Sequence, residues 1–166
     1  MFSIRPEQPS DAPAIRAIHV ASFPTDAEAR LVDLLREAGN LSVSLVAEVR
    51  GDAIGHVAFS PVRVASGRVG AGLAPVAVLP SHRRQGVAAL LVRAGLAECR
   101  SAGLRWAVVL GDPAYYSRFG FEPAPDFGLS DEYGGGTNFQ VIPLVPGGVP
   151  SSDGLVWYAP QFVALA

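Results

Sequence analysis

The residues best suited to chemistry lie in a turn between an apolar run and an expected helix. The run LAPVAVLP, residues 73–80, is followed closely by Arg83-Arg84-Gln85-Gly86-Val87-Ala88. The first N–H groups of a helix have no partner within it, and the helix dipole adds partial positive charge there. Glycine and alanine allow a close approach, and two guanidinium groups add charge. The turn therefore suits a pyrophosphate; the alternative is a helix start with ordinary surface arginines.

The expected elements place this turn inside an α/β sheet. Alternating or continuous apolar runs predict strands, and apolar residues at helical spacing predict helices. The expected strands are 2–6, 41–50, 53–64, 69–80, 104–111, 139–146 and an edge strand at 154–162. The expected helices start at Ser10 or Asp11 and run to about Ala21, start at Thr25 and end at Gly39, run from about Arg84 to Gly103, and cover 113–118.

The connections between these elements follow from their lengths and turn residues. Arg50-Gly51-Asp52 suits a tight hairpin, so the three strands between 41 and 80 should form an antiparallel meander. A strand, helix and strand in succession predict a right-handed crossover and a parallel pair. Residues 126–137 are polar and glycine-rich, which predicts a loop.

The composition excludes several classes of protein. Apolar residues make up 49%, charged residues 17%, and the net charge is −2, which argues for a globular protein and against a nucleic-acid-binding surface. The sequence has no lysine, so neither a Schiff base nor a P-loop is possible. Cys99 is the only cysteine, which excludes an internal disulfide and a multi-cysteine zinc site. We expect Cys99 to be a half-buried structural thiol rather than a nucleophile, and no metal site is expected. The N-terminal stretch lacks the apolar core of a signal peptide, and no apolar run could span a membrane, which favours a cytoplasmic protein.

The wider pattern resembles a known family. A strand, then R-x-x-G-x-A, then an apolar helix resembles the acyl-CoA-binding core of the GNAT superfamily of N-acetyltransferases, whose signature is Q/R-x-x-G-x-G/A. Arg83, Gly86 and Ala88 occupy its three defined positions. Downstream, VLGDPAYYSRFGFEPA resembles the family segment in which a tyrosine, here Tyr116, precedes Gly-Phe. With GLxPxAVLP and a closing WYAPQF, the layout is similar to a bacterial subgroup described as YhbS-like, most strongly over 72–124.

The resemblance implies one domain over residues 1–166, an α/β fold whose mixed sheet has two splayed central parallel strands and flanking helices. Those strands would be 73–79 and 105–111, with a pantetheine arm between them. Ala77 and Val78 would pair with the arm through their backbones, and the Val78 amide would stabilise the oxyanion. The diphosphate of acetyl-CoA would bind at Arg83, Arg84, Gln85, Gly86, Val87 and Ala88.

By resemblance, Tyr116 is expected to bind the cofactor by contact with its sulfur and to donate a proton to the leaving thiolate. A phenol with a pKa of about 10 is protonated at neutral pH and lies near a thiol pKa of about 8.5. The alternative is that Tyr116 only packs against Phe119 and Phe121. The asparagine that the family often has seven residues before this tyrosine is Val109 here.

The general base is open at this stage. An amine with a pKa near 10.4 is almost entirely protonated at pH 7, so a base or a water is expected. Many relatives have a glutamate on the strand before the phosphate turn, but LAPVAVL has no carboxylate. The candidates are Glu28, Glu48, His56, Asp112 or a water; Asp112 could instead cap a helix, and His56 could be a satisfied structural histidine. His19 is expected on a helix face.

The expected function is therefore acetyl-CoA-dependent transfer of an acetyl group to a primary amine, by direct attack in a ternary complex. Two alternatives remain: a non-catalytic acyl-CoA-binding or sensing module, and a protein or peptide acetyltransferase. The partners would be a small-molecule or peptide amine and, through an exposed edge at WYAPQF, a second copy of the chain as a homodimer. Neither a nucleic acid nor a membrane is expected as a partner.

Overall fold

The computed structural model describes residues 1–165 and shows an α/β fold with a mixed sheet and flanking helices. The chain groups into two compact units. The first holds Met1–Phe59, Ala74–Gly95 and the residues from Pro160 on; the second holds Ser60–Leu73 and Leu96–Ala159. No helix within residues 1–165 is both long enough and apolar enough to cross a bilayer.

The first unit contains an antiparallel hairpin and the strands next to it. Its elements are β1 (Ser3–Pro6), α1 (Ala12–Ser22), α2 (Ala27–Glu37), β2 (Val43–Val49), most of β3 (Asp52–Arg63), the end of β4 (Val69–Val78) and the start of α3 (Val87–Ser101), with short 3-10 helices η1 (Pro9–Asp11), η2 (Pro80–His82) and η6 (Pro160–Leu165). β2 pairs with β1 and β3 in antiparallel register, Ser3 opposite Glu48 and Val49 opposite Asp52. Arg50 and Gly51 both have positive φ, 52° and 86°, as a tight hairpin turn requires.

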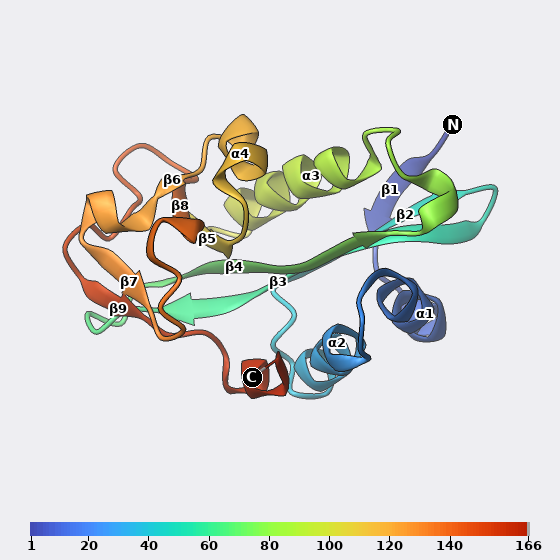
Figure 1. The fold of residues 1–166 in the computed structure, drawn as a ribbon, viewed down its shortest axis with the longest axis horizontal. Helices are drawn as coiled ribbons and strands as arrows, with labels where there is room; N and C mark the ends of the chain where they lie inside the picture. Colours follow the sequence, from blue (N-terminus) through green and yellow to red (C-terminus); the bar gives the residue numbers. More distant parts are fainter. Residues whose placement is uncertain (166) are drawn as a thin grey trace. The chain divides into compact units, whose positions relative to one another are not determined.

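Helices cover both faces of the strands in this unit. α1 and α2 lie side by side on one face, and α3 lies on the other (Figure 1). On the first face, Ile15, Val32 and Val46 form one buried apolar cluster. On the other face, a β-carbon on Gly95 would collide with the ring of Phe59, so α3 packs directly onto β3. Apolar burial on both faces explains why these strands carry few polar side chains.

The second unit is built on β5, whose apolar run is buried. It holds the end of β3, the start of β4 and the end of α3. Its other elements are β5 (Trp106–Leu110), α4 (Pro113–Tyr116), β6 (Glu122–Pro123), β7 (Leu129–Asp131), β8 (Phe139–Pro143), β9 (Gly154–Val156) and the 3-10 helices η3 (Ser117–Phe119), η4 (Ala124–Phe127) and η5 (Gly136–Asn138). Trp106, Ala107, Val108 and Val109 are all buried, as a strand covered on both faces should be.

β5 pairs with β4 in parallel and with β8 in antiparallel register. The parallel pairing runs from Ala71 opposite Ala107 to Leu73 opposite Val109. β4 continues beyond Leu73 to Val78, and Pro75, which has no N–H to give to a ladder, lies in that continuation. The predicted parallel pair is confirmed, although the paired residues of β4 end at Leu73, where the predicted strand 73–79 begins.

Several predicted boundaries were wrong for identifiable reasons. α3 begins at Val87 rather than near Arg84, because Arg84 and Gly86 have φ of 62° and 78°. Asp26 directly precedes α2, but the predicted cap Thr25 does accept a hydrogen bond from the Ala27 N–H at 3.2 Å. The predicted loop at 126–137 contains β7, which pairs in parallel with β9. The predicted edge strand at 154–162 stops at Val156, since the residues from Pro160 form η6.

Candidate active site

The turn from Arg83 to Ala88 has an unusual backbone. Arg83 is extended, Arg84 is left-handed with φ 62°, and Gly86 is again left-handed with φ 78°. A β-carbon on Gly86 would meet no protein atom within 4 Å, so the space in front of this glycine is open. Left-handed residues inside a turn direct successive N–H groups to one side, which is the geometry of anion-binding loops.

α3 begins directly after this turn. The N–H of Leu90 donates to the Gly86 carbonyl at 3.1 Å, so Gly86 is the residue before the first helical turn. The N–H groups of Val87 and Ala88 belong to that first turn, where a helix supplies no internal acceptors. Arg84, Gln85 and Gly86 are exposed and Val87 is buried, so the turn offers N–H groups and charge on a helix held by its apolar face.

Arg83 has a role that the sequence did not predict. Its Nε donates to the Val78 carbonyl at 2.9 Å, which ties the turn to the end of β4. Next along the chain, the Leu79 N–H donates to the Ile54 carbonyl of β3 at 2.8 Å. Because successive amides of an extended chain point to opposite edges, the Val78 N–H is directed away from β3.

Tyr116 belongs to the second unit and lies at the end of α4. A β-carbon on Gly111 would collide with its ring, so this glycine lets the ring lie against the end of β5. Phe121 packs edge-on against the same ring, with centroids 5.9 Å apart. Phe119 is also a neighbour, at 6.1 Å. The packing contacts that the sequence offered as an alternative are therefore present, and they hold the phenol in one place.

The phenol of Tyr116 is a weak acid here. Burial, and secondly the neighbouring Tyr115, raise its pKa to about 12. Tyr116 therefore stays protonated through the neutral range, as a proton donor must. It is a weaker acid than the value of about 10 for a free phenol implies.

The candidate bases differ sharply in their surroundings. Glu48 accepts from Arg5 Nε at 2.9 Å, and Asp112 accepts from the Ala114 N–H at 2.9 Å, which confirms Asp112 as a helix cap. Glu28 has one carboxylate oxygen that is buried without a hydrogen-bond partner among the described residues. His56 is fully buried and has two partners, as a satisfied histidine should. Glu28 and His56 are thus the two candidates not held by an arginine or a helix cap.

The sequence analysis missed a polar cluster in the first unit. His19 lies in α1, as expected, but on its buried face, and its Nε2 lies 2.8 Å from Nδ1 of His56. Ser44 contacts His56 and also Glu7, which a bidentate ion pair joins to Arg36. A histidine within a largely apolar helix and another within an apolar strand were the available signal. Their 37-residue separation hid the contact.

The sequence and the fold match those of known acetyltransferases. A model of the acetyltransferase (GNAT) domain matches residues 3–124. The uncharacterized N-acetyltransferase YhbS of Escherichia coli K12 is 46% identical over 162 residues, covering 96% of this chain and 97% of that protein. The uncharacterized N-acetyltransferase YjhQ of the same organism is 35% identical over 139 residues, covering 80% and 76%.

Two solved structures extend the comparison. Escherichia coli YhbS in complex with CoA matches with a TM-score of 0.93 and 45% identity, covering 98% of this chain and 92% of that one. A GNAT family acetyltransferase from Brucella melitensis in complex with acetyl-CoA matches with a TM-score of 0.81 and 39% identity, covering 98% of both. The chain belongs to the GNAT family of N-acetyltransferases, which confirms the resemblance read from the sequence.

Proposed function

We propose that the chain binds acetyl-CoA at the Arg83–Ala88 turn and transfers the acetyl group to a primary amine by direct attack in a ternary complex. The turn itself carries this proposal, because two left-handed residues, open space at Gly86 and a helix start coincide there. The two similar structures that hold CoA and acetyl-CoA support it. Acetyl-CoA would supply the acyl group as a thioester.

Each expected residue has a task in this proposal. Arg84, Gln85, Gly86, Val87 and Ala88 bind the diphosphate through N–H groups and charge. Arg83 holds the turn on Val78 through its Nε and directs its remaining N–H groups to a phosphate. Ala77 and Val78 pair with the pantetheine arm.

Catalysis would use one donor to oxygen and one donor to sulfur. The Val78 N–H, directed away from β3, stabilises negative charge on the acyl oxygen. Tyr116 gives its proton to the departing thiolate. Its raised pKa means that the phenol recovers a proton from water readily after each turnover. The base is Glu28 or the hydrogen-bonded cluster of side chains that contains His56.

A binding and transfer experiment tests the proposal. Calorimetry with CoA and acetyl-CoA should give heat with the wild-type protein, and an amine panel of polyamines, aminoglycosides and amino acids should reveal an acceptor. Tyr116→Phe should lower kcat by about 100-fold while CoA affinity is unchanged, because only the phenol oxygen is lost. CoA binding without transfer to any amine would instead support a non-catalytic acyl-CoA module. Transfer to peptides alone would make the protein a peptide acetyltransferase.

Three expectations on the whole chain stay predictions: one domain over 1–166, a cytoplasmic location and a homodimer. The edge proposed for the homodimer is partly occupied, because Trp157 and Arg63 exchange backbone hydrogen bonds of 2.9 and 3.0 Å. A dimer would therefore have to use the other edge of this segment. Light scattering of the purified protein measures the oligomeric state.

A further inference from the structure

Four side chains of the first unit form a continuous chain of hydrogen bonds. Ser44 Oγ donates to Glu7 Oε1 at 2.7 Å, Ser44 Oγ lies 2.8 Å from His56 Nε2, and His56 Nδ1 lies 2.8 Å from His19 Nε2. Both histidines are fully buried. The chain thus connects α1, β3, β2 and the segment after β1 through the interior of the unit.

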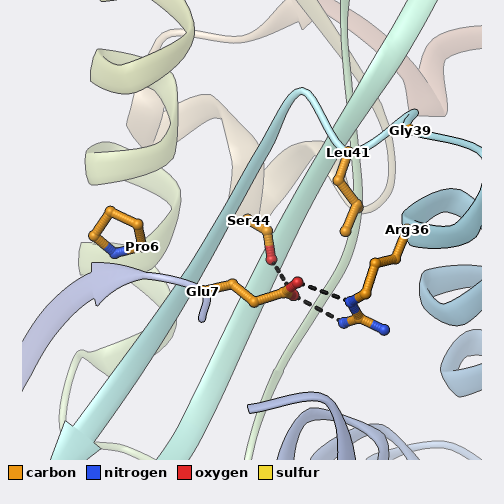
Figure 2. Close-up of a pocket in the computed structure, with 6 residues that line it drawn as sticks. All are labelled: Pro6, Glu7, Arg36, Gly39, Leu41 and Ser44. Atoms are coloured by element: carbon orange, nitrogen blue, oxygen red, sulfur yellow. Dashed lines mark hydrogen bonds and ion pairs between the residues drawn. The ribbon is translucent and has the colours of Figure 1, made fainter. Parts of the chain in front are cut away.

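The chain opens to solvent at its carboxylate end. Glu7, Ser44 and Arg36 line a cavity of about 320 Å³ together with Pro6, Gly39 and Leu41 (Figure 2). Arg36 holds Glu7 through two hydrogen bonds of 2.8 Å and also contacts Asp33 at 3.0 Å. Arg36 would therefore keep one carboxylate partner if Glu7 took up a proton.

The carboxylate end fixes the direction of every hydrogen bond in the chain. Burial acts to raise the pKa of Glu7, but hydrogen bonds from Arg36 and Ser44 outweigh it, so the pKa is lowered and the group is ionised at pH 7. Because the Ser44 hydroxyl donates to Glu7, its oxygen accepts from His56 Nε2–H. His56 Nδ1 then has no proton and accepts from His19 Nε2–H.

The end of the hydrogen-bond chain opposite Glu7 is consequently an unprotonated nitrogen, Nδ1 of His19. With its proton on Nε2, neutral His19 has an unprotonated Nδ1, and this atom is buried with no hydrogen-bond partner among the described residues. A buried polar atom is normally satisfied by protein, water or a ligand. The lone pair at His19 Nδ1 is therefore placed to accept a proton.

The strand that carries His56 lies beside the proposed acyl site. His56 follows Gly55, and a β-carbon on Gly55 would be 3.3 Å from the Ala77 carbonyl oxygen. Successive residues of a strand face opposite sides, so Gly55 faces α3 and His56 faces α1, where His19 meets it. Gly55, the residue before His56, thus lies next to Ala77, which is expected to pair with pantetheine, while His56 and His19 lie on the opposite face of β3.

We propose that His19, His56, Ser44 and Glu7 form a proton relay that carries the proton of the acceptor amine to the Glu7 cavity. The inference rests on the proposed function, in which each protonated amine that becomes an amide releases one proton. Because His19 Nδ1 is buried, it accepts that proton through water rather than directly, and His19 Nε2–H passes its proton to His56 Nδ1. His56 Nε2–H passes its proton to Ser44, and the Ser44 hydroxyl proton moves to Glu7, which releases it to water in the cavity.

The relay moves charge without leaving an imidazolium in the interior. After one transfer every hydrogen bond has reversed its direction, both imidazoles are again neutral, and the proton is on the carboxyl group. Burial lowers the pKa of His19 to about 4, and Asp33 opposes this only in part. Burial, then His19 and Arg36, lower the pKa of His56 well below its usual value, against a smaller opposite effect from Asp11. A neutral relay is therefore the form these surroundings favour.

Ring-nitrogen NMR of the whole protein tests the proton relay without any measurement of activity. The ¹⁵N spectra at pH 7 should show His19 and His56 both neutral and both protonated on Nε2. A proton on His19 Nδ1 would remove the acceptor and overturn the proposal. If the wild-type protein transfers acetyl to no amine, the proposed function fails, and these spectra still decide whether the chain is ordered as described.

Kinetics with the acceptor amine test the role of the relay. Ser44→Ala breaks the chain between His56 and Glu7, and should lower kcat at pH 7 by about 10-fold or more, with the KM for acetyl-CoA unchanged. The loss should shrink as the pH rises towards the amine pKa, because more of the amine arrives already neutral. Ser44→Thr keeps the hydroxyl and should restore most of the rate.

Two comparison variants keep the result interpretable. Ser60→Ala removes a buried serine hydroxyl of β3 that has no hydrogen-bond partner among the described residues. This variant should leave kcat unchanged. Glu28→Gln tests the competing base. A wild-type pH profile for Ser44→Ala, an equal loss at every pH, or a pH-dependent loss in Glu28→Gln alone would each overturn the relay.

Discussion

Arg84 holds a backbone conformation that an arginine adopts at a cost. Its φ of 62° is left-handed, and Arg50 in the β2–β3 turn shares this feature with φ 52°. A β-carbon in that region costs about 1 kcal/mol or more relative to glycine. Arg84 lies in the turn proposed to bind the diphosphate, whereas Arg50 lies in a hairpin turn, so the two positions differ in expected binding but share the strain.

Replacing either arginine by glycine separates stability from binding. We expect Arg84→Gly and Arg50→Gly to keep or raise the free energy of unfolding, by up to about 1 kcal/mol, because the strain is relieved. Only Arg84→Gly should weaken CoA binding, by about 10-fold, through loss of a charged phosphate contact. Urea denaturation and calorimetry measure the two effects. Equal CoA affinity in both variants would remove Arg84 from the diphosphate site.

Gly86 supports a second matched comparison. Gly86 and Gly67 have φ of 78° and 86°, and neither has a protein atom within 4 Å of a built β-carbon. Alanine at either position should lower the free energy of unfolding by about 1 kcal/mol, since the backbone is left-handed at both. Only Gly86→Ala should also raise the Kd for CoA, by about 10-fold, because its β-carbon enters the space in front of the turn. Unchanged CoA affinity would place the diphosphate elsewhere.

At the scale of elements, the contact of α3 with β3 decides how the helix lies on the strand. A β-carbon on Gly95 would collide with the Phe59 ring, so the glycine permits the close approach. Alanine is the better helix former by about 1 kcal/mol, but overpacking a core costs about 1–3 kcal/mol. We expect Gly95→Ala to destabilise the protein. Phe59→Leu in the same chain should reduce that effect of Gly95→Ala, which a double-mutant cycle in urea would measure.

The helices and strands predicted correctly are those whose sequence follows a single local rule. The continuous apolar run of β5 and the hairpin at Arg50 and Gly51 follow from burial and turn chemistry, and both are observed. β7 was missed because its three residues lie among glycines and charges, and only pairing with β9 makes them a strand. The start of α3 was placed too early because helical spacing cannot reveal the left-handed residues before Val87.

At the scale of the whole molecule, two buried histidines make stability depend on pH. His19 has a folded pKa of about 4, against 6.5 for the free side chain. The unfolded chain therefore binds more protons between these values, so stability is fully present above pH 6.5 and falls as the pH drops towards 4. His19 alone would account for up to about 3 kcal/mol.

Urea denaturation at pH 7.5 and pH 4.5 measures this dependence. The His19→Gln and His56→Gln double variant should show a smaller loss of stability between the two pH values than the wild type. Asp11 gives a separate window, because Arg5 chiefly lowers its pKa to about 2, so its contribution is lost only as the pH falls from about 4 to 2. An unchanged slope in the double variant would mean that other groups control the acid side.

The sequence by itself determined the fold class, the family and the turn that should bind the diphosphate. The fold class and the turn follow from local rules, namely apolar periodicity, glycine where the backbone needs it and a helix start after a strand, whereas the family follows from the resemblance of the motifs. Only the tertiary structure decided which candidate bases are held by an arginine or a helix cap, what holds Arg83, and that His19 meets His56. Those facts depend on contacts between residues far apart in the chain, which no local pattern encodes, because burial and hydrogen-bond direction are set by what the rest of the fold brings alongside.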